Sequence, residues 1–257
     1  MNDFQVHEVS ARVTVRVVRA MPPLSAALDA TIETLWRTAA ERVAAGGAGR
    51  LFNGLVFSID SLTPDQITGH MTEFRRIVAQ MEDPGLFPDL GIRSLAVCGV
   101  VCCADGVAIG RRPPAAIYQP GLWQLPPAGS VDQNALRPDG AIDLAGKLLT
   151  ELREEIGLHT ADTGMPRPLC LVEHPGSHVC DLGMALTTGL DAAAVLAIHR
   201  ARGNAEYDPL LVVPYGELAG FVARHRADLV PPAREFLVRL GLLPPSDGLR
   251  SPLANGG

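Results

Sequence analysis

Residues Leu125–Leu158 read LPPAGSVDQNALRPDGAIDLAGKLLTELREEIGL and are the most informative part of this chain of 257 residues. A Pro- and Gly-rich loop opens the stretch, and its second half carries apolar residues at helical spacing. Gly157 stands where a glycine commonly ends a helix. The order of loop, periodic segment and glycine predicts a helix over Asp143–Ile156 that packs one face on the protein core.

That helix would carry a cluster of carboxylates on its other face. Glu151, Glu154 and Glu155 are spaced at i, i+3 and i+4, so they lie within one turn of each other. Like charges at this spacing repel by a few tenths of a kcal/mol per pair. A divalent cation would relieve the repulsion, and oxygen ligands suit Mg²⁺ or Mn²⁺. A solvated charged face is the ordinary alternative for such a cluster.

The flanking residues favour the metal interpretation, because together they resemble the Nudix box of the Nudix hydrolases. The C-terminal half of that box reads R-E-U-x-E-E-x-G-U, where U is a bulky apolar residue. Glu151–Leu158 matches it from the first glutamate onward. Pro127–Asp132 resembles the P-G-G-x-V-E loop that precedes it, with Gly129 as the first glycine of the box.

The resemblance has three departures. The stretch between Gly129 and the helix is longer than in the family, which places an insertion within Gln133–Ile142. Thr150 stands where the family has arginine, and Ile142 where it has its first glutamate, with Asp143 next to it as a substitute. Since that arginine normally holds one glutamate in place, its loss is expected to lower metal affinity or rate without abolishing the site.

The resemblance implies an α/β fold, a Nudix α/β/α sandwich, with hydrolysis of a nucleoside diphosphate linked to another moiety. It implies Mg²⁺ or Mn²⁺ held by Glu151, Glu154, Glu155 and the carbonyl group of Gly129. Glu154 and Glu155 are thereby also catalytic candidates. A further carboxylate from a loop beyond the box often joins such a site, and Glu206 in GNAEYDPLL is our candidate, with a surface loop charge as the alternative.

Substrate-binding candidates precede the box. Arg111 and Arg112 could pair with phosphate oxygens, which guanidinium groups match in shape, although a solvated charge pair is the alternative. Trp123 and Tyr118 could stack on a base or ribose. Trp123 could equally belong to the core, because an apolar residue follows it at the spacing of a strand.

The five cysteines do not suggest a disulfide framework. Three of them lie in Leu95–Cys103, an apolar run typical of a buried strand. The other two are Cys170 and Cys180, and the segment between them contains His174 and His178. The spacing of these four residues is not that of a standard structural zinc site. Either histidine could act as acid or base, with a solvated loop residue as the alternative. These features predict a reducing, cytoplasmic location.

Composition restricts the partners. With 47% apolar residues, 19% charged residues and a net charge of −6, the chain has the composition of an acidic soluble protein. The sequence has no stripe of basic residues, so binding to a nucleic acid polymer is not expected. No apolar run is long enough to span a membrane. A small nucleoside diphosphate compound is therefore the expected partner, and a homodimer is left open.

Breaks in the pattern divide the chain into an N-terminal α/β extension over 1–90, a Nudix domain over 91–243 and a flexible tail over 244–257. The extension is expected to contain strands at Ala11–Arg19 and Leu51–Ile59 and helices at Ser25–Ala45 and Thr63–Met81. Besides the box helix, the Nudix domain is expected to contain strands at Ser94–Cys103, Val107–Gly110, Pro168–Glu173, Val179–Thr187 and Pro209–Pro214, and helices at Tyr215–Arg226 and Pro232–Leu240.

The layout of the extension and the insertion in the box resemble the UDP-glucose/UDP-galactose pyrophosphatase branch of the family. On this basis a UDP-sugar, cleaved to a nucleoside monophosphate and a sugar 1-phosphate, is the expected substrate. The alternatives are ADP-ribose, a dinucleotide or a prenyl diphosphate. A Nudix module that binds a nucleotide without catalysis is also left open.

Overall fold

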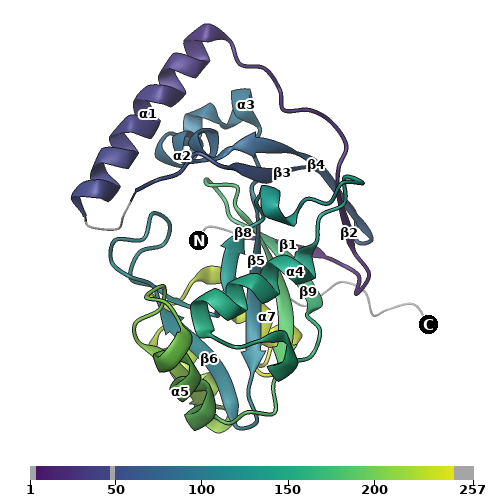
Figure 1. Cartoon of the computed structure of the whole chain (residues 1–257), viewed down its shortest axis with the longest axis vertical. Helices are drawn as coiled ribbons and strands as arrows, with labels where there is room; N and C mark the ends of the chain where they lie inside the picture. Colours follow the sequence, from purple (N-terminus) through teal and green to yellow (C-terminus); the bar gives the residue numbers. More distant parts are fainter. Residues whose placement is uncertain (1–3, 47–49, 246–257) are drawn as a thin grey trace.

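A computed structural model describes residues 4–46 and 50–245 and shows two β-sheets with helices packed around them (Figure 1). The larger sheet has β5 (Leu95–Cys102) at its centre, parallel to β10 (Cys180–Thr187). The strand order is β1 (Gln5–Glu8), β9 (Arg167–Glu173), β10, β5, β6 (Gly106–Arg111) and β11 (Leu210–Pro214), with β7 (Trp123–Gln124) paired to β6 and β8 (Ala128–Ser130) paired to β5.

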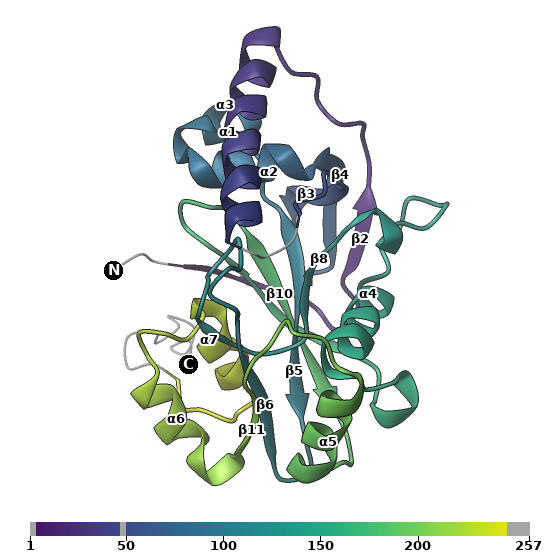
Figure 2. The same cartoon turned by 60° about the vertical axis from the view of Figure 1, so that its left-hand side comes forward.

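Helices cover both faces of this sheet, because alternate side chains along its central strands are apolar on both faces and each face needs a covering layer. Leu95, Val97 and Val101 of β5 point into a core shared with α4 (Leu144–Glu151), the box helix. Val100 points into the opposite core, which is completed by the helices α6 (Leu218–Arg224) and α7 (Pro231–Arg239). Figure 2 shows α4 on one side of the sheet and α6 and α7 on the other. The α/β fold with helices on both faces is thus confirmed.

The smaller sheet belongs to the N-terminal part of the chain. It has the order β2 (Thr14–Val17), β4 (Gln66–Glu73), β3 (Leu55–Leu62), and α1 (Ala26–Ala45), α2 (Phe74–Glu82) and α3 (Phe87–Leu90) lie beside it (Figure 1). Backbone hydrogen bonds join it to the larger sheet. The amide of Phe57 donates to the carbonyl of Val131 over 2.8 Å, and that of Ile59 to the carbonyl of Arg93 over 2.9 Å. The N-terminal part therefore rests directly on the loop that leads into the box.

The helix expected over Thr63–Met81 is wrong in its first half. Thr63, Pro64 and Asp65 form the turn of a β-hairpin, and β4 follows before α2 begins at Phe74. Proline at the start of a helix and proline in a tight turn use the same backbone angle, so this signal is ambiguous. The buried residues of β4 pack on β3, and this tertiary pairing decides the outcome.

Other expected elements are present with shifted ends, and some elements were missed. The strand expected at Leu51–Ile59 is β3, and the one expected at Ala11–Arg19 is only β2. β1 was not expected, and it pairs with β9 of the larger sheet. The helix expected at Tyr215–Arg226 is present as a helical turn over Tyr215–Glu217 followed by α6. The other unexpected elements are α5 (Ala192–Arg202), β7, β8, α3 and the short helical turns Pro84–Leu86, Gln133–Ala135 and Thr160–Asp162.

The domain boundaries at residues 90 and 243 stay predictions, and the expected tail lies outside the described residues from 246 onward. Among the described residues, no helix is both long enough and apolar enough to cross a bilayer.

Candidate active site

The box helix changes its winding where the glutamates lie. After α4 the chain continues as a π-helical turn over Leu152–Ile156 and stops at Gly157, which has the positive φ of 86° expected of a C-cap glycine. A side chain at Gly157 would also collide with Arg202 of α5, since a Cβ atom would lie 2.8 Å from that residue's Cβ. The helix predicted over Asp143–Ile156 is confirmed, and its last turn has the widened form often found at functional sites.

Glu155 is the innermost carboxylate of the box. It is only 4% exposed, and its Oε2 accepts a hydrogen bond of 3.0 Å from the backbone amide of Ala128. Burial and the neighbouring charge of Glu151 hold the pKa of Glu155 well above its ordinary value. Among the described residues, Glu155 has no cationic side chain within ion-pair distance. Glu155 is therefore a buried carboxylate that is held to the box loop by a hydrogen bond and, within the described residues, lacks a counterion.

Glu151 lies one turn earlier and does have a counterion. The ammonium group of Lys147 contacts Glu151 and also Asp132, whose Oδ2 is 2.8 Å from the Lys147 Nζ. Burial raises the pKa of Glu151 against the opposing pull of this ammonium. Gly129 leaves room for the carboxylate, because a Cβ atom at that position would lie 2.5 Å from the Glu151 Oε1. A side chain at Gly129 would therefore push the Glu151 carboxylate out of its position, which explains the glycine there.

Lys147 is the residue that the sequence analysis missed. The family's arginine position is occupied by Thr150, whose hydroxyl donates to the carbonyl of Gly146 and takes no part in the cluster. Lys147 reaches the glutamate from one turn earlier and ties it to Asp132 of the loop. The i, i+4 spacing of Lys147 and Glu151 was visible in the sequence and could have identified the pair.

Glu154 differs from the other two glutamates in its exposure. Its side chain is 54% exposed, and its Oε1 lies 3.5 Å from a guanidinium nitrogen of Arg153. Its charge still contributes to raising the pKa of Glu151.

A cavity of about 740 Å³ opens beside the box loop, between the N-terminal part and the larger sheet. Its floor includes Ala128, Gly129 and Ser130 of β8. The N-terminal part contributes an apolar wall, whose members are Val43, Leu51, Phe74, Ile77 and Met81. No residue of the insertion Gln133–Ile142 lines the cavity. The insertion instead contacts β2, where the amide of Val17 donates to the carbonyl of Gly140 over 2.9 Å.

Arg112 and Glu206 meet at the box end of this cavity. Arg112 Nη1 lies 3.8 Å from Glu206 Oε1 and donates to the Gln124 Oε1 over 2.6 Å, while its Nε donates to the carbonyl of Tyr118 over 3.1 Å. These bonds fix the guanidinium group against the cavity wall. The charge of Glu206 also contributes to raising the pKa of Glu155.

Arg111 and Trp123 are not brought to the cavity. Trp123 is buried in the core on the α6 face, edge-on to Phe221 with ring centroids 5.4 Å apart. Arg111 lies over the Trp123 ring at 5.6 Å, and its Nε donates to the carbonyl of Gly121. The structure therefore favours the core alternative for Trp123.

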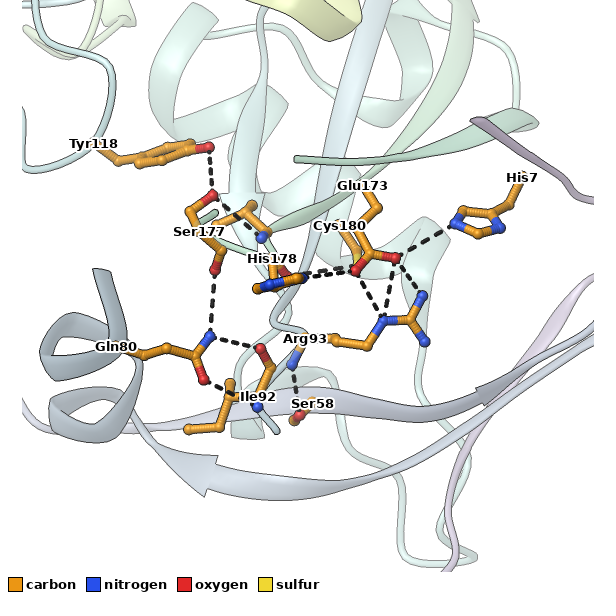
Figure 3. A network of polar contacts seen from close by, with 11 residues as sticks. His7, Ser58, Gln80, Ile92, Arg93, Tyr118, Glu173, Ser177, His178 and Cys180 are labelled. Atoms are coloured by element: carbon orange, nitrogen blue, oxygen red, sulfur yellow. Dashed lines mark hydrogen bonds and ion pairs between the residues drawn. The ribbon is translucent and has the colours of Figure 1, made fainter. Parts of the chain in front are cut away.

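His178 belongs to a separate polar network around Glu173, drawn in Figure 3. Glu173 is buried, accepts hydrogen bonds from Arg93 and lies 3.0 Å from His178 Nδ1. Burial alone would raise the pKa of Glu173, but the hydrogen bonds and charges of Arg93 and His178 lower it overall. His7 of β1 lies 3.4 Å away, so the network joins the terminal strand, β9 and the segment before β5. It stabilises the fold and does not line the cavity.

The donor set of the box suits a hard divalent cation, although within the described residues no three His, Cys, Asp or Glu side chains form a ready-made metal cluster. Glu155 is buried and has no counterion among the described residues. Its carboxylate and that of Glu151 would both attract a divalent cation. Lys147 already neutralises Glu151, and Glu154 faces solvent. The carboxylates thus fit such an ion, with Lys147 competing for one of them.

Comparisons with known proteins return structural similarity alone. No family model and no curated protein matches the chain. Among solved structures, DR0079 of Deinococcus radiodurans is similar at 14% identity and a TM-score of 0.44, over 71% of this chain and 96% of that one. The Nudix hydrolase RenU of M. smegmatis is similar at 17% identity and a TM-score of 0.39, over 58% of this chain and 84% of that one.

A bifunctional NMN adenylyltransferase/ADP-ribose pyrophosphatase of Francisella tularensis is similar at 11% identity and a TM-score of 0.41. The match covers 66% of this chain and 48% of that longer one.

Proposed function

We propose that this chain is a metal-dependent Nudix hydrolase that cleaves the diphosphate of a nucleoside diphosphate-linked compound. The observation that carries the proposal is the position of Glu155 and Glu151. Both carboxylates contact the Ala128–Gly129 loop, and that loop is the floor of the large cavity. Arg112 and Glu206 line the same end of the cavity. Buried carboxylates, a fixed guanidinium group and a second acidic side chain together suit phosphate chemistry.

Each side chain has a role in this proposal. Glu151 and Glu155, with Glu154 at the solvent side, would hold Mg²⁺ or Mn²⁺. Such a cation would supply charge neutralisation at phosphorus and activation of the attacking water. Arg112, already fixed by Gln124, binds a phosphate oxygen through its guanidinium group.

Glu206 accepts the proton of the attacking water, because it is partly exposed in the cavity and lies beside Arg112. Water adds to one phosphorus, the bridging P–O bond breaks, and its oxygen leaves with the other phosphate. The products are a nucleoside monophosphate and the phosphorylated partner.

For the linked moiety we propose a sugar, so that a UDP-sugar yields a nucleoside monophosphate and a sugar 1-phosphate. The cavity supports a substrate larger than a diphosphate, since about 740 Å³ is within the range of sites for drug-sized ligands. The N-terminal part supplies much of its wall. Binding energy from a remote group can then be used to orient the reacting phosphorus.

The test is a screen for hydrolysis with Mg²⁺ over UDP-sugars, ADP-ribose, dinucleotides and nucleoside triphosphates. The variant Glu155→Gln keeps the shape of the side chain and removes its charge, so we expect kcat to fall by orders of magnitude. Glu217→Gln is the matched control, because Glu217 is exposed on a turn outside the cavity. Wild-type turnover by Glu155→Gln would exclude the box as the active site.

One observation favours a second candidate function. The ammonium group of Lys147 already neutralises Glu151, as it would in a nucleotide-binding module that no longer needs a metal. A protein that binds UDP-glucose tightly in the presence of Mg²⁺ yet hydrolyses no compound of the screen would support that module instead of the hydrolase.

A further inference from the structure

A second polar group lies in the wall of the cavity, apart from the box carboxylates. Asp181 of β10 is 7% exposed, and its Oδ2 lies 2.6 Å from the Nε2 of His174, which is 4% exposed. The Nδ1 of His174 lies 2.9 Å from the hydroxyl of Tyr118, and that hydroxyl lies 3.1 Å from the Oγ of Ser177. Asp181 and Tyr118 both line the cavity. Figure 3 shows Tyr118 reaching Ser177 in the turn between β9 and β10.

The chemistry of the groups assigns the protons along this chain. A carboxylate only accepts hydrogen bonds, so His174 donates its Nε2 proton to Asp181. The Nδ1 atom of a neutral imidazole is then an acceptor, and the Tyr118 hydroxyl donates to it. Since this uses the only proton of the phenol, the Tyr118 oxygen accepts from Ser177 and keeps acceptor capacity for a ligand.

The other oxygen of Asp181 accepts from the thiol of Cys98 over 3.4 Å. Burial and the charge of Asp181 raise the pKa of that thiol well above its ordinary value, so Cys98 remains a donor. Asp181 forms no ion pair with lysine or arginine among the described residues. Its partners are all hydrogen-bond donors held by the fold, and its negative charge remains next to the cavity.

The Asp181–His174–Tyr118 chain thus presents two acceptor oxygens to a cavity whose lining from the N-terminal part is apolar apart from Arg50. An anionic group would be repelled by Asp181. An apolar group would remove water from both oxygens and offer no donor to their remaining acceptor capacity, which is costly. A group with hydroxyl donors satisfies both.

We propose that Tyr118 and Asp181 form a subsite for a hydroxyl-bearing ring of the substrate, either the linked sugar or the ribose of the nucleoside. The proposal rests on the proposed function for the presence of a nucleotide-linked compound. His174 is a positioning residue in this subsite, because it fixes the direction of the Tyr118 hydroxyl and touches no ligand itself. The proposed subsite lies in the cavity wall formed by β10 and the loop before the box.

The experiment compares the binding of UDP-glucose, UDP and 2′-deoxyuridine diphosphate glucose by titration calorimetry, in wild type and in Tyr118→Phe and Asp181→Asn. We expect UDP-glucose to bind roughly 3-fold to 10-fold more weakly to Tyr118→Phe and roughly 10-fold to 100-fold more weakly to Asp181→Asn, as expected for a neutral and a charged hydrogen bond. Tyr215→Phe is the matched control, because its hydroxyl bonds to the carbonyl of Cys103 away from the cavity.

The ligand series separates recognition from a structural role. If the subsite holds the hexose, UDP binds equally to all variants, and UDP-glucose and its 2′-deoxy analogue both lose affinity in Tyr118→Phe and Asp181→Asn. If it holds the ribose, the deoxy compound already binds weakly to wild type and is insensitive to both substitutions. Equal weakening of all three ligands in both variants would overturn the subsite, as would unchanged binding of all three. Failure of the hydrolase proposal is a separate result, because binding is measured without turnover.

Discussion

Replacing Lys147 by methionine tests whether its ammonium group neutralises the carboxylate of Glu151. The side chain of Lys147 is 10% exposed and that of Glu151 is 14% exposed, so the ion pair is nearly buried. Removing one partner of a buried pair costs about 3–5 kcal/mol, whereas an exposed pair contributes at most about 1 kcal/mol. Glu151 can also take up a proton, which limits the loss. We therefore expect Lys147→Met to lower the free energy of unfolding by about 2 kcal/mol near neutral pH.

The pH dependence follows from the direction of the pKa shift of Glu151. Its folded-state pKa already lies above the ordinary value of 4.5, so its charged form destabilises the fold. Without Lys147 the folded-state pKa rises further. The deficit of the variant should be largest above that pKa and shrink as the pH falls through it, since a protonated Glu151 no longer needs a counterion.

Urea unfolding near neutral and at mildly acidic pH measures both effects through the transition midpoint, provided that the slope is unchanged. Arg153→Met is the matched control on the same helix, because Arg153 is exposed and, among the described residues, forms an ion pair only with exposed Glu154. If the two variants differ by less than about 0.5 kcal/mol, Lys147 does not neutralise the box. Millimolar Mg²⁺ should stabilise Lys147→Met more than wild type, since a bound ion replaces the lost charge.

Two further predictions concern the network outside the cavity and the glycine at its floor. Glu173→Gln should destabilise the protein by about 3 kcal/mol near neutral pH, because Arg93 loses its buried carboxylate. The pKa of Glu173 is lowered by folding, so this difference should vanish in urea unfolding as the pH falls through the folded-state value. Gly129→Ala should displace the carboxylate of Glu151 and lower kcat/KM by roughly 100-fold, with a melting temperature close to that of Gly189→Ala, where a Cβ atom meets nothing within 4 Å. Full activity of Gly129→Ala would show that the position of Glu151 is not critical.

Local spacing explains how much of the site the sequence could predict. Glu151 and Glu155 are one helical turn apart, and helix geometry alone places them on a common face next to the preceding loop. Arg112 and Glu206 lie far apart in the chain, and they were predicted from residue chemistry and family resemblance. The pairing of β11 with β6 brings their loops together, and no pattern in either segment contains that contact.

The missed residues are those whose role comes from tertiary contacts. Lys147 was hidden by attention to Thr150, the position where the family has its arginine, although the compensating charge lies one turn away. Asp181 stands in a strand that is otherwise buried, and a carboxylate there needs fixed partners. That anomaly was a visible signal. Its partner His174 could be identified only once the β9–β10 hairpin paired Asp181 with Val172, two residues before His174, and so placed the two side chains on the same face.

The N-terminal part shows why a cavity is harder to predict than a motif. The extension and the insertion both carried the resemblance to the UDP-sugar branch, but of these two segments only the extension lines the cavity. The insertion instead packs against β2, where the carbonyl of Gly140 accepts a hydrogen bond from the amide of Val17. The extension can reach the cavity because β3 bonds directly to the loop at Val131, two residues from Gly129. The same hydrogen bonds that attach the N-terminal sheet therefore also hold α1 and α2 with their apolar side chains at the cavity beside the box, and a change of register at β3 should alter substrate binding before it alters the chemistry at the glutamates.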